Sequence, residues 1–261
     1  RQSLGSLSES VAVFDPELLL RIIEELGGRL EPVRNAGRGY LQQALTSVDG
    51  SVVKTLATIT EAMYLKNCHC DAKSAWRLHT HFDIDHHVPR RIDVTGGLNK
   101  GKAAERSVLR KALQPDHCYV MDRGYVEFLL FNDIHAIESS YVCRVADNSV
   151  YEVLEERQLS EEARAADVLF DGVVQLGISM TPEKQPNHPT RLIHVKTTPH
   201  TQRGKRPTGK TGPSSDGILR IATNLLDVPA EIIADIYRHR WTTEVYQADY
   251  VSSAVLYHVA A

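Results

Sequence analysis

Two groups of residues in this sequence could hold a metal ion, and their patterns differ. Residues 79–87, HTHFDIDHH, contain four histidines and two aspartates within nine positions. The second group consists of three acids far apart in the chain, Asp49, Asp122 and Glu244. Imidazoles suit Zn²⁺, whereas carboxylates suit Mg²⁺ or Mn²⁺. Two such ions about 3.5–4 Å apart can promote in-line displacement at phosphorus, so the second group would indicate phosphoryl-transfer chemistry.

The histidine-rich segment is predicted to be a strand rather than the metal site. Alternate residues of a strand share a face, and a polar row opposite an apolar row is typical of a half-exposed strand. The polar row would consist of His79, His81, Asp83 and Asp85. Four such side chains lie too far apart along a strand to converge on one ion. A zinc site that adds Cys68 and Cys70 to the two histidines is the alternative, although the CHC spacing matches no standard zinc module.

The three distant acids stand in contexts that favour a site. Asp49 and Asp122 end the apolar runs ALTSV and CYVM, and acids that follow strands line the crevice where open α/β sheets bind ligands. For either aspartate alone, a turn former or helix cap is the alternative. Tyr237, Arg240 and Glu244 are three and four residues apart, so they would share one helical face. The alternative there is a surface ion pair, worth about 0.3–0.5 kcal/mol.

The order of predicted elements brings two of these acids together. Three strands are followed by a helix, a strand, a helix and a strand. Their ranges are 44–53, 76–85, 90–97, 102–113, 117–122, 126–137 and 139–145, with a short helix favoured over 55–65. This is the order of the ribonuclease-H-like fold, an α/β fold with a mixed sheet flanked by helices. The first and fourth strands of that sheet are central neighbours, which would place Asp49 beside Asp122.

After residue 145 the sequence changes to short strand-like pieces separated by polar loops. This pattern favours a β-rich insertion over residues 146–229, followed by a helix that starts near Pro229. A loop at 201–217 carries basic residues that could touch phosphates, although a solvated loop fits equally well. These residues are Arg203, Lys205, Arg206 and Lys210.

The composition is that of a globular protein with a sizeable core. The chain has 261 residues, of which 42% are hydrophobic and 24% charged. No apolar run approaches the length of a bilayer-spanning helix. The four cysteines suit reduced thiols in a cytosol better than a disulfide framework. Because the net charge is −3, any basic surface for nucleic acid must be local.

Several of these segments resemble one known family. VDG, YVMDRGY and IYRHRWTTE, in this order, look like the catalytic segments of bacterial insertion-sequence transposases with a DDE triad, the fourth insertion-sequence family. LHTHFDIDHHVPRRIDVTGG and YVCRVADNSVYEV are also similar to that family, and the resemblance covers roughly residues 4–246. It implies that Asp49, Asp122 and Glu244 bind two Mg²⁺ or Mn²⁺ ions and that the protein cuts and joins DNA phosphodiesters.

The resemblance also implies where DNA would bind. Tyr237 and Arg240 would touch phosphates near the scissile end, and the β-rich insertion would help to handle DNA. Arg123, Arg203, Lys205 and Arg206 are the further candidates for DNA contacts. The expected partners are transposon ends and target DNA, with a homodimer assembled on the DNA in the bacterial cytoplasm.

The sequence departs from the family pattern near its end. The family has a lysine seven residues after the glutamate, where this chain has Val251. We therefore expect a chain truncated at both ends. Its parts would be an N-terminal helical remnant of a DNA-binding region (1–39), a catalytic core (40–145 and 230–250), the insertion (146–229) and an atypical tail (251–261). The alternative functions are an inactive remnant that binds DNA weakly and a metal-dependent nuclease that only hydrolyses.

Overall fold

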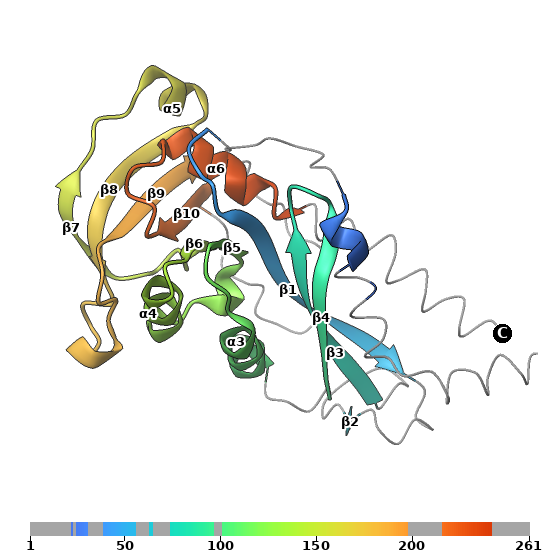
Figure 1. Cartoon of the computed structure of the whole chain (residues 1–261). Helices are drawn as coiled ribbons and strands as arrows, with labels where there is room; N and C mark the ends of the chain where they lie inside the picture. The colour runs from blue at the N-terminus through green and yellow to red at the C-terminus, as the bar shows by residue number, and fades with distance from the viewer. Residues whose placement is uncertain are drawn as a thin grey trace, which may run out of the picture.

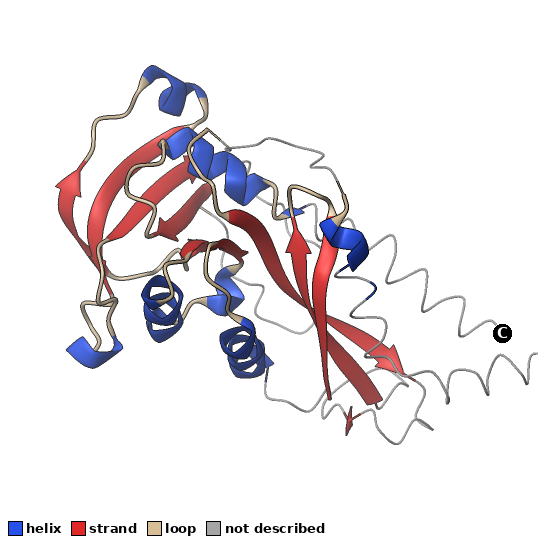
Figure 2. Ribbon diagram, in the orientation of Figure 1, coloured by secondary structure: helices blue, strands red, loops and turns tan. Residues whose placement is uncertain are grey.

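One mixed sheet dominates the molecule. The structure is a computed structural model that describes residues 22, 25–30, 39–55, 63–64, 74–96, 101–197 and 216–241. Within these residues a ten-stranded sheet has the order β2-β3-β1-β5-β6-β10-β9-β8-β7, and β4 pairs with β3. Figure 2 shows how few helices accompany this sheet.

The first half of the sheet has the ribonuclease-H-like strand order. Its strands are β1 (Ala44–Thr55), β3 (Ser74–Asp83), β4 (Val88–Gly96), β5 (His117–Met121) and β6 (Ser140–Arg144). β3 is antiparallel to β1 and β4, whereas β5 is parallel to β1 and β6. The predicted neighbourhood of the first and fourth of these strands is therefore confirmed. The short β2 (Met63–Tyr64) pairs with the start of β3, so the helix predicted over residues 55–65 is wrong at these two positions.

Helices cover both faces of this part of the sheet (Figure 1). On one face, α3 (Gly101–Ala112) and α4 (Phe128–Ala136) pack on a cluster that includes Tyr119 and Met121 of β5. On the other face, α6 (Ala230–Arg238) buries Ile233 and Ile236 against a cluster that includes Leu45 and Val120. The spacing of apolar residues along α6 gives it this buried stripe. Pro229, with its restricted φ, precedes the first turn as the sequence predicts.

The strands after residue 145 extend the same sheet. They are β7 (Tyr151–Glu156), β8 (Val168–Leu176), β9 (Thr190–Lys196) and β10 (Ile218–Thr223), with the short helices α5 (Glu161–Ala165) and η2 (Pro182–Lys184) between them. β10 is antiparallel to β6, and β9, β8 and β7 follow in order. These strands therefore share backbone hydrogen bonds with the part of the sheet that carries Asp122.

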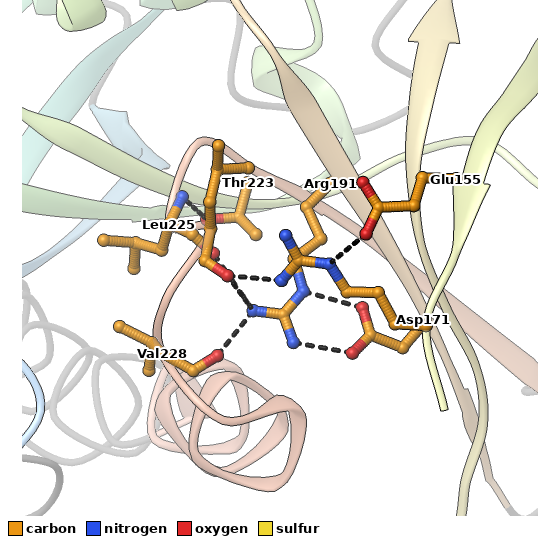
Figure 3. Close-up of polar contacts among 8 residues, drawn as sticks. Glu155, Asp171, Arg191, Thr223, Leu225 and Val228 are labelled. Carbon is orange, nitrogen blue, oxygen red and sulfur yellow. Dashed lines mark hydrogen bonds and ion pairs between the residues drawn. The ribbon is translucent and has the colours of Figure 1, made fainter. Parts of the chain in front are cut away.

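A buried arginine connects these strands to the segment that enters α6 (Figure 3). Arg191 of β9 is 3% exposed, and its Nε and Nη2 donate to the two carboxylate oxygens of Asp171 at 2.6 and 2.7 Å. Its Nη1 donates to the carbonyls of Leu225 and Leu226 at 3.1 and 3.2 Å, and to that of Val228. Each nitrogen of the guanidinium thus has an acceptor, as a charge in the core requires.

The structure also bears on three other expectations from the sequence, which concern the N-terminal helix, the cysteines and membrane-spanning helices. Of the N-terminal segment predicted to be helical, residues 22 and 25–28 are helical, and Ile22 and Leu26 are 47% and 57% exposed. Cys118 and Cys143 are buried free thiols, while Cys68 and Cys70 lie outside the described residues. Within the part of the chain that the structure describes, no helix is long and apolar enough to cross a bilayer.

The Arg191 contacts make a prediction about stability. Arg191→Met should lower the free energy of unfolding by about 3–5 kcal/mol, because the Asp171 carboxylate would stay buried without its counter-ion. Urea denaturation followed by circular dichroism would measure this loss. Arg238→Met is the matched control, since the Arg238 side chain is 67% exposed and its pair with Asp235 should contribute less than about 1 kcal/mol. Equal losses in the two variants would contradict the prediction.

Two buried histidines predict how stability depends on pH. Burial lowers the pKa of His81 to about 4. Burial and then the neighbouring His135, whose ring stacks on His188 at 4.3 Å, lower the pKa of His188 to about 4. Because an unfolded histidine titrates near pH 6.5, the unfolded chain binds more protons between about pH 6.5 and 4. The stability contributed by these neutral rings is therefore complete above pH 6.5 and is lost as the pH falls through this window.

The expected slope is up to about 1.4 kcal/mol per pH unit for each histidine. Urea midpoints at pH 7.5, 6.0 and 5.0 would measure it. His188→Gln, which keeps a partner for the Tyr141 hydroxyl but cannot titrate, should reduce the pH dependence. An unchanged dependence in this variant would show that the His188 ring is not held neutral by the fold.

Candidate functional site

Asp49 and Asp122 occupy neighbouring positions on two parallel strands. The pairing of β1 with β5 ends at Val48↔Met121, and the two aspartates are the next residues of each chain segment. The backbone of Asp122 is still extended, with φ −82° and ψ 176°. Alternation along both strands therefore turns the two side chains to the face that α6 covers. Asp49 lies inside β1, which continues to Thr55 with β3 as its partner, so the predicted strand over residues 44–53 is confirmed.

The Asp122 carboxylate also caps the short helix that follows it. Its Oδ1 accepts a hydrogen bond from the Gly124 N–H at 2.6 Å, at the start of η1 (Arg123–Tyr125). The helix-cap alternative is thus realised, but it uses only Oδ1. Oδ2 makes no hydrogen bond with any residue that the structure describes. Arg123, the first residue of η1, is exposed beside this carboxylate.

Tyr237 and Arg240 are buried and interact electrostatically with Cys143 of β6. α6 ends at Arg238, so Arg240 follows in a turn rather than on the continuous helical face predicted, and its N–H donates to the Tyr237 carbonyl at 3.1 Å. The Arg240 guanidinium lies 5.9 Å from the Tyr237 ring centroid and 5.0 Å from that of Trp241. Both buried side chains interact electrostatically with Cys143, whose thiol donates to the Asp122 carbonyl at 3.5 Å.

Tyr237 and the two buried cysteines of the sheet are held in their neutral forms. Burial raises the pKa of Tyr237 to about 12. Burial, with a smaller effect of Asp122, raises the pKa of the Cys143 thiol well above its ordinary value, and burial raises that of Cys118 to about 12. Tyr237 can therefore donate a proton in a hydrogen bond. The two cysteines are not activated as nucleophiles.

The remaining predicted site residues lie outside the described residues. These are Glu244, Arg203, Lys205, Arg206 and Lys210. Within the described ranges, no group of three His, Cys, Asp or Glu side chains could hold a metal ion. Asp49 and Asp122 by themselves are suitable ligands for a hard divalent ion. Both supply carboxylate oxygens from adjacent strands, and such ions prefer oxygen ligands.

The histidine-rich strand is buried on both faces, so the prediction of a half-exposed strand is wrong. β3 lies between β1 and β4, and its polar row is buried like its apolar row. His79 Nε2 bonds Thr95 Oγ1 at 2.8 Å, and the Asp83 carboxylate accepts from His86 and Arg90. Protein groups therefore bond to His79 and Asp83 of this row. His81 lines a pocket of about 550 Å³ at the end of β1 and β5 that is opposite to the aspartates.

No motif in the sequence pointed to the ion pair of Glu105 with Arg77, which lies near Asp49. Glu105 of α3 pairs with Arg77 of β3, and both side chains are largely buried. A Cβ on Gly50, the residue after Asp49, would lie only 2.7 Å from Glu105 Oε1. The only signal in the sequence was the glycine itself, at a position where the close approach of another side chain leaves no room for a Cβ.

Tyr125 lies among the carboxylates of this end of the sheet. Burial raises its pKa well above the ordinary value, and Glu105, Asp49 and Asp122 raise it further, in that order. All three carboxylates therefore act on the same phenol. The Arg77 guanidinium has the opposite, smaller effect.

Comparison with known proteins gives the family of the chain. The sequence matches the family described as Transposase DDE domain over residues 41–249, a range that contains Asp49, Asp122 and Glu244. No curated protein matches. Among solved structures, the piggyBac transposase synaptic complex with hairpin DNA is similar at 9% identity and a TM-score of 0.43, covering 78% of this chain. This chain spans 40% of that chain. Because the family match extends over most of its length, the chain belongs to the Transposase DDE domain family.

Proposed function

We propose that this chain is the catalytic core of a DDE transposase that cuts and joins DNA phosphodiesters. Asp49, Asp122 and Glu244 would hold two Mg²⁺ or Mn²⁺ ions. The observation that carries the proposal is the position of Asp49 in β1 and of Asp122 directly after β5, where the pairing of the two strands ends, on the face covered by α6. Bound ions would activate the attacking oxygen and stabilise the leaving oxygen during in-line displacement at phosphorus.

The residues around the aspartates support the handling of DNA phosphates. A guanidinium can form two parallel hydrogen bonds to a phosphate, which suits Arg240 near the scissile group. Tyr237 stays protonated because of its burial, so its hydroxyl can donate to a phosphate oxygen. The exposed Arg123 adds positive charge next to Asp122. Arg203, Lys205 and Arg206 would contribute further contacts to the DNA backbone.

The reaction needs no covalent intermediate on the protein. Water as the attacking group would nick DNA, and a free 3′-hydroxyl would join one strand to another. The raised pKa values of Cys118 and Cys143 agree with direct displacement. The proposed partners are transposon ends and target DNA, bound by a homodimer in the bacterial cytoplasm.

Asp122→Asn should abolish nicking of a supercoiled plasmid in the presence of Mn²⁺. Asparagine can still cap η1 through its side-chain oxygen but carries no charge for the ion, so we expect a loss of more than about 100-fold. Asp116→Asn is the matched control, because Asp116 is exposed at the opposite end of β5. Its backbone φ of 58° is one that asparagine also adopts. Nicking that survives in a folded Asp122→Asn protein would refute the assignment.

The products of the same assay separate transposition from simple hydrolysis. A labelled oligonucleotide with a free 3′-hydroxyl, added with the plasmid, should become joined to it. Nicking without any joined product, over a range of end sequences, would favour a nuclease that only hydrolyses.

Arg240→Gln should weaken DNA binding in a salt-dependent way. The loss of one phosphate contact is expected to reduce the slope of log affinity against log salt concentration by about 1. Fluorescence anisotropy with a labelled duplex, between low and moderate salt, would measure this slope. Arg238→Gln, a nearby exposed arginine, is the control and should change the slope less. Equal slopes for wild type and Arg240→Gln would show that Arg240 does not contact phosphate.

A further inference from the structure

We propose that Arg77 and Glu105 form a charge pair that sets the affinity of the aspartate site for divalent ions. Glu105 would not touch the ion. Its negative charge would change the affinity of the site for the ion from a distance. The inference rests on the proposed function, because it concerns the same ions. It goes further by assigning a role to two residues that lie outside the Asp49, Asp122 and Glu244 triad.

The pair is built against the backbone next to Asp49. Glu105 approaches Gly50 so closely that a Cβ there would lie 2.7, 2.9 and 3.1 Å from its Oε1, Cδ and Cγ atoms. Arg77 approaches from β3, two positions before His79, which is opposite Gly50 in the β1–β3 ladder. The carboxylate of Glu105 therefore lies on the α3 face of β1, while Asp49 points to the α6 face.

Tyr125 connects the pair to both aspartates. It follows Asp122 in η1 and is 2% exposed. Its pKa is affected by the charges of Glu105, Asp49, Asp122 and Arg77. The pair is thus within electrostatic reach of the place where the ions would bind. A negative charge there attracts a divalent cation, and a positive charge repels it.

The other ion pairs of α3 differ from this one. Arg110 pairs with Asp133 and Glu127, and Arg106 pairs with Glu127, so these contacts connect α3 to the start and middle of α4. They are more exposed than the pair of Arg77 with Glu105. A buried ion pair contributes little to stability compared with apolar side chains of similar size. Its position beside Asp49 is therefore better explained by its charge than by its contribution to folding.

The pair makes two predictions of opposite sign. Glu105→Gln removes the carboxylate and leaves the Arg77 charge uncompensated, so Mn²⁺ should bind on the order of five-fold more weakly. Arg77→Gln leaves the Glu105 charge uncompensated, so Mn²⁺ should bind more tightly by a similar factor. The double variant should bind about as the wild type does. Glutamine at either position can keep a hydrogen bond to its partner, which favours retention of the fold.

Isothermal titration calorimetry with MnCl₂ would measure these affinities without DNA. Circular dichroism and thermal unfolding would confirm that each variant is folded. Asp133→Asn is the matched control, since it removes one carboxylate from an α3 ion pair that contacts neither Gly50 nor Tyr125, and its affinity should match the wild type. Glu105→Asp keeps the charge and should also match it, which tests the inference even if Arg77→Gln fails to fold.

Weaker binding in both single variants, or no change in either, would overturn the inference and indicate a purely structural pair. Asp122→Asn keeps this result separate from the proposed function. One outcome is that Asp122→Asn abolishes Mn²⁺ binding while the Glu105 and Arg77 variants change the Mn²⁺ affinity alike. That outcome would support the metal site and refute only the role of the pair. If the folded wild-type protein binds no Mn²⁺, both proposals fall.

Discussion

The buried guanidinium of Arg191 is the interaction on which the position of α6 depends. It bonds Asp171 on one side and the carbonyls of Leu225, Leu226 and Val228 on the other, just before the helix begins. A charge that is almost fully removed from water must keep all its acceptors, so this segment cannot shift without leaving donors unsatisfied. One arginine of the later strands thereby holds the helix that covers the two aspartates.

The continuous sheet also connects the later strands to the aspartates. β10 pairs with β6, and Asn224, which follows β10, accepts from the Tyr141 N–H and donates to the Ser139 carbonyl, both at 3.0 Å. The later strands are therefore bonded to the strand next to β5. If they also contact DNA, as proposed, a force on them would be transmitted through backbone hydrogen bonds to the strand that carries Asp122.

Charge around the aspartates is balanced from both faces of the sheet. Arg240 follows α6 and interacts electrostatically with Cys143, and Arg77 pairs with Glu105 of α3 and affects Tyr125. The two carboxylates concentrate negative charge where the pairing of β1 with β5 ends. Under the proposed function, the carboxylates would hold a hard cation, and the guanidinium groups would favour an anionic phosphate.

The sequence by itself determined most of the strands and helices, because alternating and helical periodicity express which side chains avoid water. It also indicated Asp49 and Asp122, since each follows an apolar run. Tertiary structure alone decided three things. Neighbours on both sides bury the polar row of β3, which its own pattern marked as half-exposed. β10 joins β6, a choice of partner that no local pattern contains. Glu105 meets Gly50 because helix packing turns that face of α3 toward β1, and contacts between residues so far apart depend on the folded chain.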